Sequence, residues 1–366
     1  MGKTPLLFFP YSHMKKQNII VTRQLEQHLD HAIADIRPDR LFVLTDASTR
    51  QCCLPLVSHF NCMADAHHIS IPAGEEYKTL NSAVHVWQEL QHMGATRHSL
   101  VINLGGGMVC DLGSFAAATF KRGMHFINIP TTLLAMVDAS AGGKTGINFE
   151  GLKNEIGVFR QADRVIVDTR FLKTLDQQNL LSGYAEMLKH GLISDRQTWA
   201  HLLADDILSD NWADMLGPQI AESIQIKQRL VSADPLERGL RKALNFGHTA
   251  GHAFESFSML SPSCKPVLHG YAVAYGMVVE LYLSTIKSSF PVDAMRQTVR
   301  FIRENYGCLV ITCNDYPTLL QLMTHDKKNT VGHINFTLLA DIGDVRINQT
   351  ATEDEIKEAL DFYREA

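Results

Sequence analysis

The sequence lacks any long hydrophobic run. Its first apolar stretch, Leu6 to Pro10, is much shorter than a membrane-spanning helix and carries no cleavage pattern. A basic tract is also missing, because 34 Lys and Arg and 39 Asp and Glu residues are dispersed along the chain and leave a formal net charge of −5. We therefore expect no membrane and no nucleic-acid partner, whereas a local cluster of lysines still permits a small anionic substrate.

Cysteine is scarce and forms no motif. The seven cysteines are an odd number, Cys52 and Cys53 are adjacent, and no two have the Cys-x-x-Cys spacing of a zinc or redox site. This usage fits a reducing cytosol, so we expect a cytoplasmic protein. At 366 residues, 45% of them hydrophobic, the chain is long enough for two domains with separate cores.

The first half of the sequence alternates short β-branched runs with amphipathic stretches such as Leu80 to His92. This alternation is typical of βαβ units and predicts a mainly parallel sheet, with a nucleotide at the carboxyl ends of its strands. We place a Rossmann-like α/β domain over residues 1–170. The predicted strands are Asn18–Thr22, Leu41–Thr45, His68–Ile71, Ser99–Leu104, His125–Ile129 and Arg164–Val167.

The second half changes to long segments with a period of about 3.6 residues and few strand candidates. We expect a mainly helical domain over residues 171–366. Its last helix opens with a capping box, Thr352 to Glu355, and a hairpin is predicted where Ile334–Leu339 and Asp344–Ile347 flank a Gly-Asp turn. The predicted helices include Ser182–Leu192, Gln219–Val231, Val273–Ile286 and Thr352–Arg364.

His248 and His252 are four residues apart in a segment whose apolar positions suit a helix. Two imidazoles at this spacing project from one helical face and can converge on an ion or a substrate, although such pairs also occur on solvated faces. Glu186 and His269 offer further ligands from separate segments. Two histidines and one carboxylate can form a catalytic divalent-metal site with open positions.

A glycine-rich segment, Leu104 to Gly113, follows a predicted strand and precedes a helical pattern. Glycines there let the backbone approach a pyrophosphate, and the helix N-terminus offers free N–H groups. Because Cys110 occupies the last position of Gly-x-Gly-x-x-Gly, a tight turn without a nucleotide is an open alternative. Asp46 and Glu75 are candidate acids for a ribose hydroxyl.

A second glycine-flanked segment, Ala141 to Gly146, matches a Walker A loop only in part. Asp138 replaces the first glycine of that motif, so we exclude an NTPase. Lys144 then lies on a loop where it can bind a substrate phosphate, the alternative being a solvated surface loop. Further bases near the candidate metal ligands suggest a substrate with more than one negative group: Lys189, Lys227, Arg241, Lys327 and Lys328.

Taken together, these residues resemble the 3-dehydroquinate synthase family from about Asp46 to Val345. Cys110 stands where the family usually has glycine, and we expect it to crowd the pyrophosphate slightly. The motifs that carry the resemblance stand in the family's order: Gly-Glu-x-x-Lys-Thr at 74–79, Gly-Gly-Gly-x-x-x-Asp-Leu at 105–112, Gly-Gly-Lys-Thr-Gly-Ile-Asn at 142–148, Glu-x-x-Lys at 186–189, Gly-Leu-Arg at 239–241, Leu-Asn-Phe-Gly-His-Thr-x-Gly-His at 244–252, Leu-His-Gly at 268–270 and Asp-Lys-Lys at 326–328.

The resemblance implies an NAD-binding α/β domain, a helical metal-binding domain, an active site between them and a homodimer. It implies that Glu186, His248 and His269 bind Zn2+ or Co2+, which leaves His252 to handle protons. The implied NAD positions are Asp46, Glu75, Lys78, Gly106, Gly107, Asp111, Thr131, Thr132, Lys153 and Thr174.

The resemblance also assigns substrate and catalytic positions. Glu237 is implied as a proton acceptor, Asp138 and Lys189 join it and His252 in catalysis, and Arg122 is implied to reach the site of the neighbouring subunit. The implied substrate positions are Arg122, Asp138, Lys144, Asn154, Lys189, Lys227, Arg241, Asn245, and one of Lys327 and Lys328.

The implied reaction converts 3-deoxy-D-arabino-heptulosonate 7-phosphate, a sugar phosphate, into 3-dehydroquinate and phosphate. Transient oxidation by NAD, phosphate elimination, re-reduction and intramolecular aldol closure follow one another, so NAD is not consumed. Another sugar phosphate cyclase and an NAD- and metal-dependent polyol dehydrogenase are alternatives. A non-catalytic relative is disfavoured because Glu186, His248, His269, Lys144 and Lys189 are all present.

Overall fold

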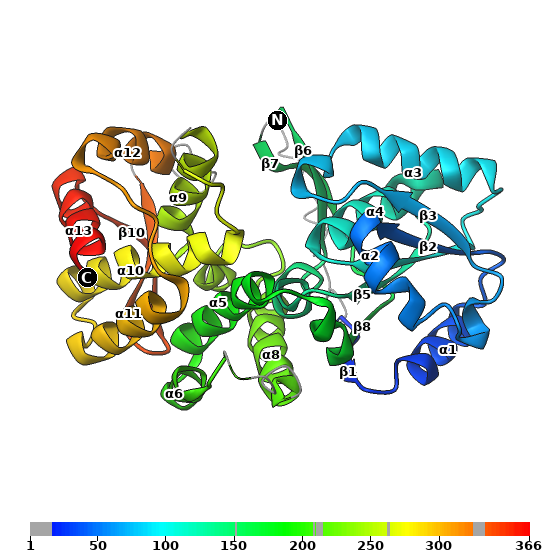
Figure 1. Ribbon diagram of the computed structural model, residues 1–366, viewed down its shortest axis with the longest axis horizontal. Coiled ribbons are helices and arrows are strands. Elements are labelled where there is room, and N and C mark those ends of the chain that lie inside the picture. Colours follow the sequence, from blue (N-terminus) through cyan, green and yellow to red (C-terminus); the bar gives the residue numbers. More distant parts are fainter. Residues whose placement is uncertain (1–16, 151, 208, 210–214, 262–263, 325–333) are drawn as a thin grey trace, which may run out of the picture.

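The structure, a computed structural model, describes residues 17–150, 152–207, 209, 215–261, 264–324 and 334–366. Figure 1 shows two halves side by side, one built on a sheet and one mainly of helices. Within the described residues, no helix combines the length and apolar character needed to cross a membrane. The division predicted at residue 170 follows the last strand of the sheet, and it stays a prediction.

A six-stranded parallel sheet forms the first half, in the order β1-β8-β5-β4-β2-β3. The six strands predicted from the sequence are confirmed, each within one residue at either end. Every residue of β4 is buried, as expected for a central strand covered on both faces. The strands are β1 (Ile19–Thr22), β2 (Leu41–Asp46), β3 (His67–Ile71), β4 (Leu100–Gly105), β5 (His125–Pro130) and β8 (Arg164–Asp168).

The order of the strands places a reversal of winding at the carboxyl ends of β2 and β4. The chain continues from β2 to β3 on one side and from β4 to β5 on the other, so the direction of winding reverses between β2 and β4. Ligands of open α/β sheets bind at such a reversal. The helices of this half are α1 (Leu25–Ile36), α2 (Ala47–Cys52), α3 (Leu80–His92) and α4 (Gly107–Thr119).

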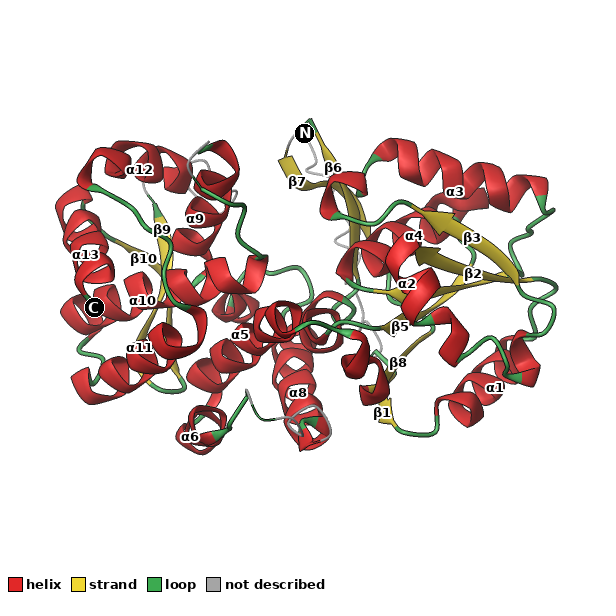
Figure 2. Ribbon diagram, viewed as in Figure 1, coloured by secondary structure: helices red, strands yellow, loops and turns green. Residues whose placement is uncertain are grey.

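An antiparallel hairpin, β6 (Lys144–Phe149) and β7 (Leu152–Phe159), stands apart from the main sheet and rises between the two halves in Figure 2. The prediction of a loop at Lys144 is therefore wrong, because this residue begins a strand. Gly142 and Gly143, with φ of 113° and 68°, make the turn that leads into β6. β7 lacks the alternation of a half-buried strand because nearly all of it is exposed.

The second half consists of helices around a two-stranded hairpin, as predicted. The capping box is confirmed: Glu355 N donates to Thr352 Oγ1 at 3.3 Å, and Thr352 N donates to Glu355 Oε2 at 2.7 Å. The elements are α5 (Gln177–Ser194), α6 (Arg196–Ala204), α8 (Gly217–Ala233), α9 (His248–Leu260), α10 (His269–Ser288), α11 (Val292–Tyr306), α12 (Tyr316–Thr324), α13 (Glu353–Glu365), β9 (Asn335–Asp341) and β10 (Asp344–Thr350).

The two halves meet at a π-helical turn, η5 (Ala135–Ala139), which follows β5. Both α5 and α8 contact this turn, and both lie in the middle of the molecule in Figure 1. Short π-helical segments are frequent at functional sites. The turn carries Asp138, so this candidate residue lies at the junction of the halves.

Candidate active site

The candidate NAD residues gather at the carboxyl edge of the sheet. Most of them follow a strand, because all the parallel strands end at the same edge and a turn begins after each of them. Asp111 lies one turn into α4, and Lys153 lies on β7. The residues at the edge are Asp46 at the end of β2, Glu75 and Lys78 after β3, Gly106 and Gly107 after β4, Thr131 and Thr132 after β5, and Thr174 after β8.

The glycine-rich turn is closely packed. A Cβ atom on Gly106 would lie 3.1 Å from Thr132 Cγ2, so a side chain there would push against the segment after β5. Gly106 is the N-cap of α4 and has no side chain to cap the first N–H groups of this helix, which can bind an anion. The Cys110 side chain is buried, with Sγ 3.5 Å from the Gly105 carbonyl oxygen, so it fills interior space behind the turn.

Lys78 is a buried cation at this edge. Its Nζ donates to Asp111 Oδ2 and to Asn154 Oδ1, each at 2.6 Å. Burial alone would lower the pKa of Lys78, but the carboxylates of Asp111 and Glu75 outweigh it and raise the pKa, so the ammonium is charged. The structure thus places Asn154, predicted to contact substrate, beside a predicted NAD residue.

Glu186, His248 and His269 form a compact group of potential metal ligands, each offering one atom within 4.8 Å of the others. They come from three helices: Glu186 from the middle of α5, and the histidines from the first positions of α9 and α10. His248 Nε2 and His269 Nε2 lie 3.5 Å and 3.6 Å from the same oxygen, Glu186 Oε1. Two nitrogens and one carboxylate thus face a common point.

The chemistry of this group fits a divalent cation. Glu186 is completely buried and neither carboxylate oxygen makes a hydrogen bond, although Lys189 forms an ion pair with it. Burial alone would lower the pKa of His269, but Glu186 and Glu255 raise it to about 10. Such a pocket favours positive charge, and its nitrogen and oxygen donors suit Zn2+ or Co2+.

His252 lies beside this group but is not part of it. Its ring centroid is 5.3 Å from that of His248 and 5.9 Å from that of His269. The helical spacing predicted for His248 and His252 is confirmed, since both lie on α9. Glu186 and His269 complete the ligand group with His248, and the proton-handling role of His252 stays a prediction.

Helix packing positions the two histidines. Gly276 of α10 lies against the start of α9, where a Cβ atom would be 2.0 Å from the Gly247 carbonyl oxygen. Glu280, fully buried one turn further along α10, accepts hydrogen bonds from the backbone N–H groups of Gly247, Thr249 and Ala250 at 2.7, 2.9 and 3.2 Å. This carboxylate satisfies the free N–H groups of α9 and fixes the two helices relative to each other.

Cations and acids pair at the junction of the halves. Lys227 Nζ donates to Asp138 Oδ1 at 2.6 Å and to its carbonyl oxygen at 2.7 Å. Lys144 forms an ion pair with Glu237, and Asn245 Nδ2 donates to Glu237 Oε1 at 2.9 Å. Burial alone would raise the pKa of both acids, but Lys227 lowers the pKa of Asp138 and Lys144 lowers that of Glu237.

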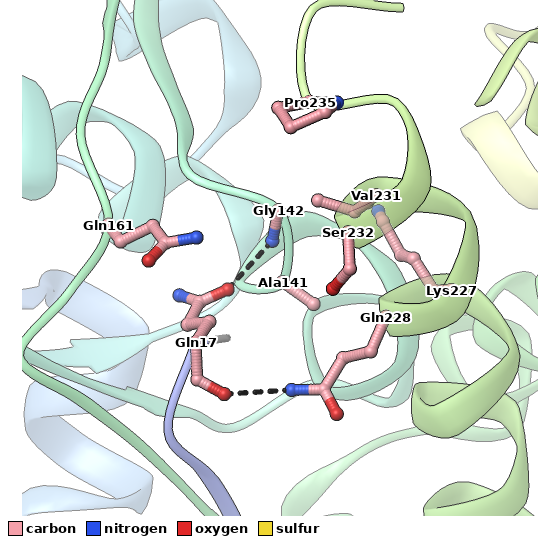
Figure 3. A pocket seen from close by; sticks show the side chains of 9 residues that line it. All are labelled: Gln17, Ala141, Gly142, Gln161, Lys227, Gln228, Val231, Ser232 and Pro235. Carbon is pink, nitrogen blue, oxygen red and sulfur yellow. Dashed lines mark hydrogen bonds between the residues drawn. The ribbon is translucent and has the colours of Figure 1, made fainter. Parts of the chain in front are cut away.

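Arg241 and Gln17 hold the turn between Asp138 and Lys144. The Arg241 guanidinium is buried and donates to the Pro235 carbonyl at 2.8 Å and, at 3.5 Å, to that of Gly142. Behind the turn, Figure 3 shows a hollow in which Gly142 N donates to Gln17 Oε1 at 2.9 Å and Gln228 Nε2 donates to the Gln17 carbonyl at 2.9 Å.

The structure does not bring Arg122 to the site of its own chain. Helix α4 starts at the carboxyl edge and its 13 residues, about 20 Å of helix, return to the opposite edge, where exposed Arg122 precedes β5. Lys327 and Lys328 lie outside the described residues, so the structure does not place this predicted substrate contact.

Sequence reasoning missed three buried groups around the site: Glu255, Glu280 and His190. Glu255 shares a helical face with His248 and His252, at positions i, i+4 and i+7, which is a signal that could have found it. Glu280 carries no such signal, whereas His190 lies four residues after Glu186 on α5, a spacing that places both on one helical face. His190 Nδ1 lies 2.6 Å from Ser223 Oγ, and burial lowers its pKa to about 3.

Family models described as 3-dehydroquinate synthase N-terminal and C-terminal match residues 68–182 and 183–329. A 3-dehydroquinate synthase of Parabacteroides distasonis is 50% identical over 353 residues, which cover 96% of this chain and 99% of that protein.

Two solved structures share the fold. One is 2-deoxy-scyllo-inosose synthase complexed with carbaglucose-6-phosphate, NAD+ and Co2+, with a TM-score of 0.81 at 21% identity. The other is 2-epi-5-epi-valiolone synthase from Streptomyces hygroscopicus with NAD+ and Zn2+ bound, with a TM-score of 0.79 at 26% identity. Each alignment covers 96% of this chain and 97% of the other. By the two family models and the half-identical relative, the chain belongs to the 3-dehydroquinate synthase family.

Proposed function

We propose that this site catalyses the 3-dehydroquinate synthase reaction with NAD at the carboxyl edge of the sheet and a divalent ion held by Glu186, His248 and His269. The observation that carries the proposal is the placement of this ligand group beside the buried cations Lys189 and Lys227. A substrate with a carboxylate, a phosphate and vicinal hydroxyls needs both kinds of partner.

The two cofactors are proposed from the donors and from the neighbours. The similar structures are named with NAD+ and with Co2+ or Zn2+, and the ligand group offers nitrogen and carboxylate donors that both metals accept. When bound, NAD supplies the transient oxidation and its reversal, and the ion polarises the vicinal oxygens of the substrate.

Different residues are proposed to bind the carboxylate end and the phosphate end of the substrate. Arg241, whose planar fork suits a carboxylate, is proposed for the carboxylate end with Lys227, which approaches the same residue, Gly142, and with Asn245, which donates to Glu237. Lys144 is proposed for the phosphate end, because its ammonium is half exposed at the start of β6 and faces an acid that an anion can replace.

Proton transfers are assigned to Glu237 and His252. Removal of the C6 proton, made acidic by the neighbouring ketone, permits β-elimination of phosphate. Glu237 is ionised and is positioned by Asn245 and Lys144. His252 stands beside the ligand group, where a proton can pass to or from the substrate oxygens. Asp138 and Lys189 keep the charges around them balanced.

We also propose a homodimer and a cytoplasmic location. On β7, Leu152, Ile156 and Phe159 are 59%, 37% and 54% exposed, and among the described strands β7 pairs only with β6. Exposed apolar edge strands are usually covered, and a second copy is the proposed cover. Such an assembly would let Arg122 serve the neighbouring site.

The experiment is a phosphate-release assay with 3-deoxy-D-arabino-heptulosonate 7-phosphate, in which absorbance of NADH is followed at the same time. We expect phosphate release that requires NAD, is abolished by a chelator and is restored by Zn2+ or Co2+, without accumulation of NADH. Stoichiometric NADH would indicate a polyol dehydrogenase, and phosphate release only from another sugar phosphate would indicate a different cyclase.

A further inference from the structure

Glu255 connects the two halves of the molecule. It lies on α9, its side chain is 7% exposed, and its two carboxylate oxygens face in different directions. Oε2 is 3.5 Å from Nδ1 of His269, a candidate metal ligand of the helical half. Oε1 accepts from Nζ of Lys153 at 2.6 Å, and Lys153 belongs to the β6–β7 hairpin of the sheet half.

The contact with His269 determines which of its nitrogens can bind an ion. Nε2 faces Glu186 and Nδ1 faces Glu255. When a carboxylate accepts the Nδ1 proton, the lone pair of the neutral ring is on Nε2, the nitrogen that points toward the ligand group. Glu255 therefore holds both the orientation and the tautomer that an ion needs.

The contact with Lys153 continues toward the nucleotide edge. Its chain neighbour Asn154 accepts a hydrogen bond from Lys78 Nζ, and Lys78 pairs with Asp111 on the helix that the glycine-rich turn begins. A ligand that holds the hairpin at this edge thus holds Lys153 against Glu255.

We propose, on the basis of the proposed function, that Glu255 is a positioning residue that orients His269 and couples the ion to NAD. NAD binding keeps Lys153 in place, Lys153 keeps Glu255 in place, and Glu255 presents His269 to the ion. Because linkage is reciprocal, each cofactor raises the affinity for the other by the same factor.

The test measures Zn2+ affinity by competition with a chromophoric chelator, with and without saturating NAD, and no turnover is needed. In the wild type we expect NAD to tighten Zn2+ binding about fivefold or more. Glu255→Gln keeps the shape but removes the charge, and we expect it to weaken Zn2+ binding about tenfold, and Glu255→Ala up to about 100-fold, with the NAD effect lost. Co2+ spectra of both variants should change with the orientation of His269.

Two controls separate positioning from general damage. Glu353→Gln removes an acid of the same kind that pairs with Lys357 on the exposed face of α13, and it should bind Zn2+ as the wild type does. Lys153→Met removes the partner of Glu255 Oε1 and should abolish the NAD effect on Zn2+ binding, measured at an NAD concentration that fluorescence titration shows to saturate this variant. Unchanged Zn2+ affinity in Glu255→Gln, or an unchanged NAD effect in it, overturns the proposal. A wild type that binds no divalent ion would instead overturn the proposed function.

Discussion

The nucleotide edge and the metal-ligand group are built in different ways. The edge is made mainly of residues in the turns after the strands, so most of its parts are local in the sequence. The ligand group joins Glu186, His248 and His269 from three helices, and packing around Gly276 and Glu280 sets its geometry. We therefore expect the nucleotide edge to tolerate the loss of one contact and the ligand group to depend on all of its members.

The two regions also differ in charge. The edge offers helix N–H groups and one buried ion pair between Lys78 and Asp111. At the ligand group, Glu186 lies with Lys189 and His190 on α5, and all three are fully or almost fully buried. Removing one charge from such a cluster leaves its partner unpaired in a low-dielectric interior, which costs several kcal/mol. We therefore expect the largest effects there.

Glu186→Gln should have the largest effect. It keeps the shape of the side chain but removes the charge that holds an ion, so we expect kcat/KM to fall at least about 1,000-fold, on the order of 4 kcal/mol. Zinc content by elemental analysis should fall with it, while NAD affinity changes less than tenfold. A Glu186→Gln variant that retains both its metal and its activity would show that the ligand group is no more sensitive to substitution than the nucleotide edge.

Arg241→Lys should have a smaller but clear effect. The compact ammonium keeps the charge and loses the fork, so we expect kcat/KM to fall at least about tenfold, or about 1.4 kcal/mol, with metal content and NAD affinity near wild type. Lys144→Ala, at the other end of the proposed substrate, is the comparison. Wild-type kinetics for Arg241→Lys would mean that the substrate carboxylate binds elsewhere.

Gly106→Ala tests the nucleotide edge. The added methyl group would lie 3.1 Å from Thr132 Cγ2 and would have to displace it by a few tenths of an ångström. We expect the Kd for NAD, measured by fluorescence titration, to rise about fivefold, or about 1 kcal/mol. Zn2+ affinity measured without NAD should not change, and a parallel loss of Zn2+ would show that the regions are not separable.

The pH dependence of stability gives the smallest prediction. Burial lowers the pKa of His190 from 6.5 to about 3, so the unfolded chain takes up a proton that the folded protein does not. The stabilisation that neutral His190 contributes is fully present at pH values above the pKa of the unfolded chain, and it is lost as the pH falls below that pKa. Between pH 7.5 and 6.0 the free energy of unfolding should decrease by about 0.8 kcal/mol more in the wild type than in His190→Asn, measured by urea unfolding. Equal slopes would contradict a neutral, buried His190.

The features that could be predicted from the sequence are those that depend on residues close together in the chain. The six strands are short runs rich in β-branched and other apolar residues, so their existence and order of appearance follow from local pattern alone. The glycine-rich turn was found for the same reason. The β6–β7 hairpin was missed because β7 is exposed and mixes Lys153, Asn154 and Glu155 with apolar residues, a pattern that no buried face imposes.

The candidate site was less accessible to sequence reasoning. Helical spacing drew attention to His248 and His252, whereas Glu186 and His269 join His248 only through the packing of α5 and α10. The resemblance to a family supplied this set before the structure did. It did not supply Glu255, because a carboxylate that links two halves is recognisable only when both halves are in place.

At the junction of the halves, carboxylates of the protein itself pair with the lysines that are proposed to bind the anionic groups of the substrate. Asp138 pairs with the ammonium group of Lys227, and Glu237 pairs with that of Lys144, as the anionic groups of a substrate would. We expect the anionic groups of the substrate to replace these carboxylates as partners of the lysines. A neutral polyol has no anionic group that could do so. A polyanion that pairs with Lys144 would also release Glu237, so we expect the proposed base to become available only when a substrate is bound.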